Sequence, residues 1–366
     1  MPDVIEHGKN RVLRLLALLS AGAMCCYPQA PDSLCRLAAL TDEEWQLLEG
    51  GNVVSKALKP NHERELAVAG VARVRASREC FLERFRDIES FKKSPSVRQI
   101  GKLSAPSDAW DLAGLSLDPQ DVEALRDCDI GSCKVKVPVR VIQRLACEPE
   151  GSARDYSARA NSIFREELLT YLQSYRFQGD RALIRYRDKD GPLSLAEQFH
   201  SLLSGWSELN ELAPEFSNLL ARGSPPALEN VEEFLYWSKE AFGLKPVISV
   251  THVIIYQLPD RAWIASKQIY ASHYFDASLA ITLVVDDPAD LSGHSIYLAY
   301  LNRSRIDLLG GILGGLRRSV VRGRLVGGMS RNLQQTVTKL ESSCPTQTTS
   351  RGGLCGPVLA RPSPQR

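Results

Sequence analysis

The sequence predicts an α+β protein, in which a curved antiparallel sheet packs against a long C-terminal helix and carries a large helical insert at about residues 104–245. Three observations support this. Residues 246–304 contain four runs rich in β-branched and aromatic residues, separated by turn residues, which is typical of an antiparallel meander. From Asp307 to Leu340 the apolar residues recur at helical spacing, and residues 152–242 contain further helical stripes.

The first elements are predicted from short local signals. Thr41 and Glu44 form a capping-box pattern, so we expect a helix that begins there and ends at the glycines of positions 50 and 51. Two strands follow, at about residues 52–58 and 66–76. Ser77 caps a helix over residues 78–94, and residues 97–104 are again extended.

The insert is predicted from its helical pattern. Asp118 caps a short helix, and helices follow over residues 152–242, the last of them in "VEEFLYWSKEAFG" (231–243). The sheet, the insert and the C-terminal helix make one domain of residues 41–342. Residues 343–366 are rich in Ser, Thr, Pro, Gly and Arg, and we expect a disordered tail.

The N-terminus carries three basic residues before the apolar run "LLALLSAGAMCC" and a small-residue site at 21–23. This pattern predicts a signal peptide of residues 1–23 and therefore an exported protein. Two alternatives remain open, a lipid anchor on Cys25 and an amphipathic N-terminal helix.

Nine cysteines favour an oxidising compartment. Cys128 and Cys133 bracket an Asp-Ile-Gly turn, so we favour a local disulfide over free thiols or a metal site. Cys344 and Cys355 lie in the tail, where they either pair or stay free.

Glycines interrupt the predicted C-terminal helix. Each costs about 1 kcal/mol relative to alanine inside a helix. Gly310 and Gly314 share one helical face, and Gly311 and Gly315 share another. We expect one of these faces to allow the close approach of the sheet or of a bound molecule.

Two stretches carry a family resemblance. "VAGVARVRASRECFLERFRDIESF" resembles the opening strand and helix of the START-like (SRPBCC) helix-grip superfamily, and "SKQIYASHYFDASLAIT…YLAYLNRSRIDLLGGILGGLRRSVVRGRL" resembles its closing strands and helix. The resemblance extends over roughly residues 50–342, but the helical insert departs from a minimal domain. The chain is also similar to uncharacterised exported bacterial proteins. The resemblance implies a bacterial periplasmic protein that binds a lipid or another hydrophobic small molecule between sheet and helix.

Candidate ligand-binding residues are polar groups on the closing strands, which could orient an apolar ligand. They are His252, Lys267, Tyr270, His273, Tyr274, Asp276, Arg303 and Arg305, together with Gly310, Gly311, Gly314 and Gly315. His273, Asp276 and His252 could alternatively perform acid–base catalysis, although positions 273 and 276 face opposite sides of a regular strand. A purely structural, hydrogen-bonded role is the third alternative.

Composition narrows the class of function. A net charge of +2 does not favour nucleic-acid binding. We expect a binding protein that needs no cofactor and contacts membranes transiently, with the insert as a lid over its ligand. The alternatives are an enzyme on the same fold and a ligand-free accessory protein whose insert binds a partner.

Overall fold

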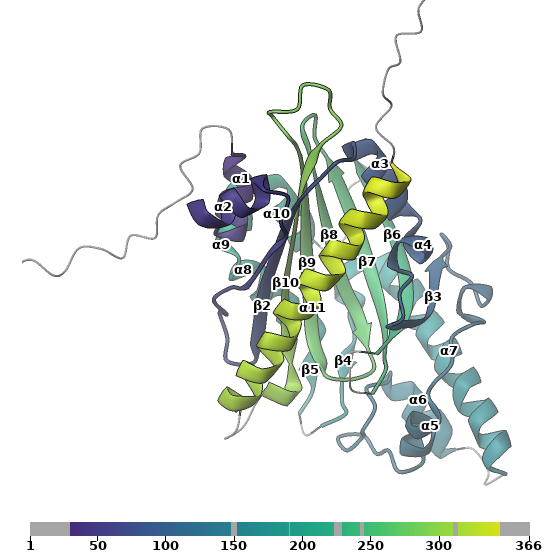
Figure 1. Cartoon of the computed structure of the whole chain (residues 1–366). Coiled ribbons are helices and arrows are strands. Elements are labelled where there is room, and N and C mark those ends of the chain that lie inside the picture. Colours follow the sequence, from purple (N-terminus) through teal and green to yellow (C-terminus); the bar gives the residue numbers. More distant parts are fainter. Residues whose placement is uncertain are drawn as a thin grey trace, which may run out of the picture.

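The computed structural model describes residues 30–147, 152–189, 191–222, 229–241, 245–309 and 314–344. The expected signal peptide lies outside these residues, and so do Gly310, Gly311 and Cys355. The main sheet has eight antiparallel strands in the order β1-β2-β10-β9-β8-β7-β6-β3 (Figure 1). The strands are β1 (Val54–Ala57), β2 (Glu65–Val74), β3 (Val97–Leu103), β6 (Val231–Glu240), β7 (Val247–Gln257), β8 (Arg261–Ala271), β9 (Phe275–Asp286) and β10 (Ile296–Ile306).

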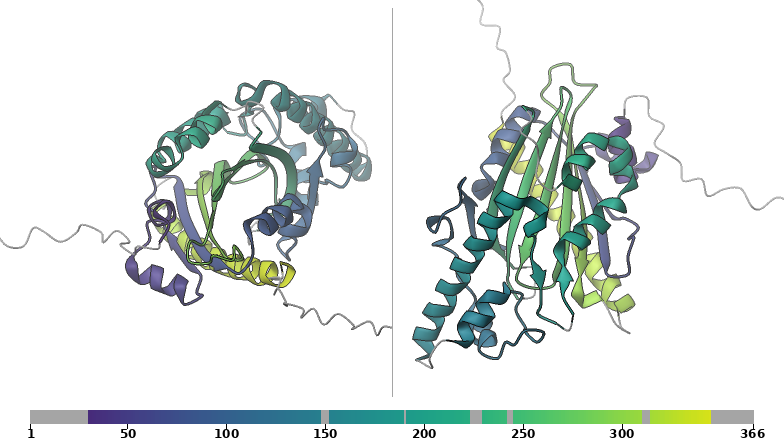
Figure 2. Two further views of the ribbon diagram at one scale, coloured as in Figure 1. Left: turned by 90° about the horizontal axis from the view of Figure 1, so that it is seen from above. Right: turned by 180° about the vertical axis from the view of Figure 1, so that it is seen from behind.

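Helices cover both faces of this sheet, which curves strongly when seen from above (Figure 2). On its inner, concave face lie α3 (Arg78–Arg86), α4 (Ile88–Lys92) and α11 (Gly314–Ser343). On its outer face lie α1 (Asp32–Ala38), α2 (Asp42–Glu49), α5 (Pro119–Arg126), α6 (Val139–Ala146), α7 (Ala153–Gln178), α8 (Leu195–Ser204), α9 (Ser207–Leu212) and α10 (Pro214–Arg222). Short 3-10 turns are η1 (Trp110–Leu112), η2 (Gly179–Ala182) and η3 (Asp307–Leu309), and β4 (Arg185–Tyr186) and β5 (Leu193–Ser194) form a small hairpin.

The α+β class, the antiparallel meander and the long C-terminal helix are therefore confirmed. β7, β8, β9 and β10 are consecutive both in sequence and in the sheet. The local signals at the N-terminus also hold. The Thr41 hydroxyl accepts a hydrogen bond from the Glu44 amide at 3.2 Å, and the Glu44 carboxylate accepts one from the Thr41 amide at 3.0 Å. Ser77 caps α3 through the amide of Cys80.

Three local predictions are wrong. The helix expected over residues 78–94 is divided at Asp87, which ends α3 and caps α4 through the amide of Ser90. Asp118 makes no side-chain capping bond to α5, which instead has a proline in its first turn. Residues 231–240, expected as the last helix of the insert, are strand β6.

Strand β6 was not predicted because its sequence lacks the alternation of apolar and polar residues that usually identifies a strand. Its last six residues, from Leu235 to Glu240, are all buried, since this strand has elements packed on both faces. A strand covered on both faces loses the alternation of apolar and polar residues that marks a strand in sequence. The helical layer therefore ends at α10, before the predicted boundary at residue 245.

Three apolar clusters pack on the sheet: a large outer cluster, an inner cluster, and a small one in which Leu66, Ile306 and Leu309 pack with Val321 of α11. The outer cluster joins α1, α2 and α5–α10 to the outward side chains of the strands, among them Trp263, Ile281 and Leu301. The inner cluster joins Phe81 and Phe85 of α3 to inward side chains of the strands and to the C-terminal half of α11. The inner cluster occupies one end of the concave face, where β10 begins.

α11 lies diagonally across the inner face and packs mainly on β2 and β1. A close approach occurs at a strand glycine, Gly70 of β2, where an added Cβ would lie 2.8 Å from the sulfur of Met329. Gly314 and Gly315 begin α11, but their surroundings lie outside the described part of the structure. Along the described part of the helix, an added Cβ at Gly323 or Gly328 would meet no atom within 4 Å.

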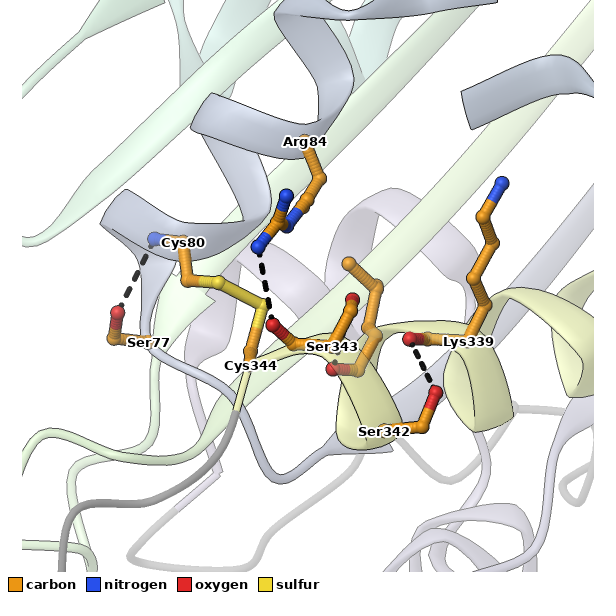
Figure 3. The surroundings of a disulfide bond; sticks show 8 residues. Ser77, Cys80, Arg84, Lys339, Ser342, Ser343 and Cys344 are labelled. Carbon is orange, nitrogen blue, oxygen red and sulfur yellow. Dashed lines mark hydrogen bonds between the residues drawn. A yellow bond between two sulfur atoms is a disulfide. The ribbon is translucent and has the colours of Figure 1, made fainter. Parts of the chain in front are cut away.

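Two disulfides are present among the described cysteines. Cys128–Cys133 closes the short loop that the sequence predicts. Cys344, assigned to the tail, instead bonds Cys80 at the start of α3, with a Cα–Cα distance of 6.0 Å (Figure 3). Next to this bond, Arg84 donates to the carbonyl of Ser343 at 3.2 Å. The end of α11 is thereby fixed to the opening helix of the domain.

Candidate functional site

The basic candidates on the strands point to the outer face, away from α11. Arg303 of β10 donates to the buried carboxylate of Glu65 at 2.6 Å. Arg305 donates to the side chains of Gln198 and Ser201 on α8, at 2.7 and 2.6 Å. These arginines therefore join the sheet to the β1–β2 connection and to the outer helical layer.

Lys267 of β8 has the same orientation. It forms an ion pair of 2.5 Å with Asp180 of η2, and its ammonium lies 4.8 Å from the centre of the Phe199 ring. Burial lowers the pKa of Lys267, and the charge of Asp180 opposes this effect only in part. The pair joins the sheet to the end of α7.

His252 of β7 belongs to a hydrogen-bonded chain on the outer face. Its Nδ1 lies 2.9 Å from the hydroxyl of Tyr175 on α7, and its Nε2 lies 3.0 Å from the carboxylate of Glu233. The bond to His252 lowers the pKa of Glu233, whereas burial raises the pKa of Tyr175 well above its usual value. The chain runs from a half-exposed carboxylate to a phenol that is 3% exposed, so its buried end is enclosed in the outer cluster.

His273 and Asp276 do not pair with each other. His273 contacts Asp121 of α5 through Nε2 at 2.9 Å. Asp276 accepts from Lys136 at 2.9 Å and from Arg64 at 2.9 Å. The two members of the pair considered for acid–base chemistry therefore bind different partners, His273 binding Asp121 and Asp276 binding Lys136 and Arg64.

The neighbouring tyrosines complete this end of the sheet. The Tyr270 hydroxyl donates to the carbonyl of Lys136 at 2.6 Å, and burial raises the pKa of Tyr270. Tyr274 has a φ of 61° in the β8–β9 turn, and its hydroxyl accepts from the amide of Lys245 at 3.2 Å. A positive φ costs a non-glycine residue free energy, and here the surrounding contacts hold it in place.

Apart from Tyr274, which packs against the same apolar cluster as Val321 of α11, the predicted polar residues of the strands do not line the space between the sheet and α11. They bind the insert to the outer face and to one end of the sheet. The enzyme hypothesis loses its proposed dyad, and the insert is a fixed outer layer rather than a lid over the inner face.

The inner face carries a different set of polar side chains, which the sequence analysis missed. The residues that alternate with the outward-facing ones form an inner polar cluster on neighbouring strands and the end of α4. Its members are Lys92, Tyr236, Ser238, Glu240, Ser249, Thr251, Ser266, Gln268, Ser278, Thr282, Tyr300, Asn302 and Ser304.

Exposure differs in part between the two faces of the same strands, since Thr282 and Ser304 on the inner face are buried but several of their polar neighbours are not. The outward residues of β8 and β10, such as Lys267, Leu301 and Arg303, are buried. Their inward neighbours Ser266 and Asn302 are only half-buried, and so are Gln268, Ser278 and Tyr300. Solvent therefore reaches the polar part of the inner face, while the outer face is closed by helices.

Part of the cluster is internally hydrogen-bonded. Asn302 donates to Ser278 at 3.0 Å and accepts from Ser304 at 2.6 Å, and the hydroxyls of Ser278 and Ser304 lie 2.8 Å apart. Within the described residues, the side-chain oxygen of Gln268 is buried and has no hydrogen-bond partner. A buried acceptor left in this state costs about 1–3 kcal/mol, so it favours a donor from outside the chain.

An ion pair lies at one edge of the cluster. Lys92 donates to Glu240 at 2.7 Å, and Ser238 donates to the same oxygen at 2.6 Å. Burial alone would lower the pKa of Lys92 and raise that of Glu240. The attraction between the two charges outweighs burial, so the pKa of Lys92 is raised and that of Glu240 is lowered.

Tyr300 lies on the same inner face as this pair, on a strand in the other half of the curved sheet. Burial raises the pKa of Tyr300 to about 12, and Lys92 opposes the rise. Tyr300 belongs to β10 and Glu240 to β6, and three strands lie between them. Their electrostatic interaction therefore reflects the curvature of the sheet, which turns both strands toward one site.

A signal for this cluster exists in the sequence. In "SKQIYAS" the inner register contains Ser266 and Gln268, and in "YLAYLNRS" it contains Tyr300, Asn302 and Ser304 after Leu298. Sequence reasoning chose the other register because it contains the charged residues. Only the assignment of α7 and α8 to the outer face decides between the two registers.

Two surface grooves lie elsewhere. One of about 340 Å³ adjoins the Cys128–Cys133 loop. The other, of about 730 Å³, runs beside β3 and is lined by Trp110, Trp237 and charged side chains of both signs. Asp111 binds the amide of Ser104 and Glu89 binds the amide of Lys102, so carboxylates occupy the edge of β3 where a further strand would pair.

Two further properties concern the described residues. No cluster of three or more His, Cys, Asp and Glu side chains there could hold a metal ion. None of the helices in these ranges combines the length and the apolar character that crossing a membrane requires.

Comparisons with protein-family models, with curated proteins and with solved structures found no match.

Proposed function

We propose that this protein is a binding protein for a small amphipathic molecule, which lies between the inner polar cluster and α11. The carrying observation is the difference between the two faces of β8–β10. Their outer side chains are buried, whereas five inner polar residues are only half-buried, namely Ser266, Gln268, Ser278, Tyr300 and Asn302. Half-exposed polar groups on a concave surface are typical of ligand sites.

The composition of the inner face supports a ligand with both apolar and polar parts. Hydroxyls and amides supply hydrogen bonds on the strands, and Gln268 offers an unused acceptor. The side chain of Met329, which is half-buried on α11, supplies a flexible apolar contact. A hydrophobic molecule with hydroxyl or carbonyl groups, such as a lipid or a polyketide, satisfies both.

We place this function on a START-like helix-grip scaffold in the bacterial periplasm. The curved antiparallel sheet around a long C-terminal helix supports the scaffold. The two disulfides are compatible with export to an oxidising compartment. A carrier in such a compartment needs a site that excludes water from the apolar part of its ligand, and it needs no cofactor.

A substitution that occupies the proposed space tests the function. In Ser266→Leu a larger apolar side chain replaces a half-buried hydroxyl at the centre of the cluster. We expect this variant to keep its melting temperature within a few degrees and to lose at least tenfold in affinity for the hydrophobic dye 1-anilinonaphthalene-8-sulfonate. Thr170→Val is the matched control, because Thr170 is an exposed hydroxyl on the outer helix α7.

Two results would contradict the proposal. Unchanged dye binding in Ser266→Leu would remove the inner face as the site. A drop in melting temperature of more than about 10 °C would mean that the inner face is closely packed and has no room for a ligand.

A further inference from the structure

The charged residues of α11 are almost all basic. Residues 308–340 contain five arginines and one lysine but no Asp or Glu, while the whole chain has a net charge of only +2. The rest of the chain is therefore net acidic. Residues 308–340, which include most of α11, are therefore a strongly basic segment of the chain.

The outward face of α11 combines this charge with apolar side chains. Val320, Arg324 and Arg331 share one face, because positions i, i+4 and i+11 align along a helix. Both arginines are exposed, and Val320 is 50% exposed. Leu325, on the flank of the same face, is 37% exposed.

Nothing among the described residues neutralises these side chains. No ion pair within the described ranges reaches Arg322, Arg324 or Arg331. Arg318 donates to the backbone carbonyl of Glu63 rather than to a carboxylate. By contrast, the helix end is neutralised, since Glu341 pairs with Arg75. Lys339, near the end of the helix, donates to the carbonyls of Ser90 and Phe91, so the exposed arginines without an ion pair lie in the middle and the N-terminal half of α11.

We propose that this face of α11 docks on an anionic phospholipid bilayer. The arginines match lipid phosphates in charge and hydrogen-bonding geometry, and exposed valine and leucine can enter the region of the headgroups. Figure 1 shows α11 running across the front of the sheet with its outer face uncovered. The surface does not depend on a bound ligand, so it can be tested separately from the function proposed above.

Vesicle binding of the full chain tests the proposal. We expect sedimentation with vesicles of phosphatidylcholine containing 30% phosphatidylglycerol, and at least tenfold weaker binding to phosphatidylcholine alone. Each arginine near an anionic surface contributes roughly fivefold to binding, so Arg324→Gln/Arg331→Gln should weaken binding by about tenfold or more. Raising the salt from 0.05 to 0.5 M should have a similar effect.

A charge-matched pair serves as the control. Arg185→Gln/Arg187→Gln removes the same charge from exposed positions on the β4–β5 hairpin, outside α11. It should bind anionic vesicles as the unmodified chain does. Val320→Ser keeps the charge and should weaken binding about threefold, which separates apolar insertion from long-range attraction.

Three results would overturn the proposal. Equal binding to neutral vesicles would exclude charge recognition. Equal losses in both double variants would show that net charge alone matters. Tighter binding to a DNA duplex than to anionic vesicles, lost in Arg324→Gln/Arg331→Gln, would assign this helix to a nucleic acid instead.

Discussion

Adding one methyl group at Gly70 tests how closely α11 lies on the sheet. In Gly70→Ala the new Cβ would lie 2.8 Å from Met329 Sδ, 2.9 Å from Met329 Cγ and 3.2 Å from Leu333 Cδ2. Contacts below 3 Å force a neighbour to move, and overpacking of this kind costs typically about 1–3 kcal/mol. The strand gains about 0.5–1 kcal/mol when alanine replaces glycine. We therefore expect a net loss of about 1–2 kcal/mol.

Thermal unfolding followed by circular dichroism measures this loss. A change of 1 kcal/mol shifts the midpoint of a large domain by about 2–4 °C, so we expect a decrease of roughly 2–8 °C. In the Met329→Ala background the methyl group has room, and the loss should largely disappear. Gly323→Ala is the control, because its Cβ meets no atom within 4 Å. It should stabilise the helix by up to about 1 kcal/mol.

The outcome that contradicts this reasoning is specific. If Gly70→Ala is neutral or stabilising in both backgrounds, α11 does not lie on β2 as closely as the structure places it. If Gly323→Ala is as harmful as Gly70→Ala, the exposed glycines of α11 contact something that the described residues do not include.

Two further predictions concern the disulfides and pH. In the chain-entropy model, removing the bond that spans 264 residues, in C80S/C344S, should cost about 5 kcal/mol. Removing the bond that spans 5 residues, in C128S/C133S, should cost about 2 kcal/mol. Equal melting temperatures of the two variants would refute this order. The pKa of Glu240 is held below its ordinary 4.5, so its ion pair stabilises the fold above that pH and is lost as the pH falls through the lower folded pKa. The difference in melting temperature between the unmodified chain and Glu240→Gln should therefore be largest near neutral pH and shrink below pH 4.5, and a difference that grows in acid would exclude this ion pair as its cause.

Sequence reasoning succeeded where a signal is local. The Thr41–Glu44 capping box, the Ser77 cap and the Cys128–Cys133 disulfide each depend on residues a few positions apart. The four strands of the meander were found because each is bounded by turn residues. Such elements are determined by the chain near them, whatever packs above.

Sequence reasoning failed where the two residues of a contact lie far apart in the chain. His273 meets Asp121, 152 positions earlier, rather than its neighbour Asp276. Cys344 meets Cys80 across almost the whole domain. The close contact between helix and sheet is made by a glycine of β2, whereas the prediction examined glycines of the helix. No pattern within a window of a few residues contains these pairings.

The prediction of the candidate site succeeded and failed for the same reasons. The strands that carry the candidate site were predicted, but the face of the sheet on which it lies was not. Which face the insert covers is decided by packing between elements that are far apart in the sequence. Charged residues such as Arg303 and Lys267 stood out in the sequence, and the structure pairs them with Glu65 and Asp180 on the outer face. The inner residues are mostly uncharged, and only their partial exposure in the structure identifies them as a candidate site.

Native mass spectrometry of the protein purified from its own cell envelope tests the central proposal most directly. We expect a bound species of a few hundred daltons or more, which extraction identifies as a hydrophobic molecule with hydroxyl or carbonyl groups. The same species should be missing from Ser266→Leu and present in Thr170→Val. A chain with only its own mass in all three preparations, or a species retained equally in Ser266→Leu, would contradict a ligand site on the inner face of the sheet.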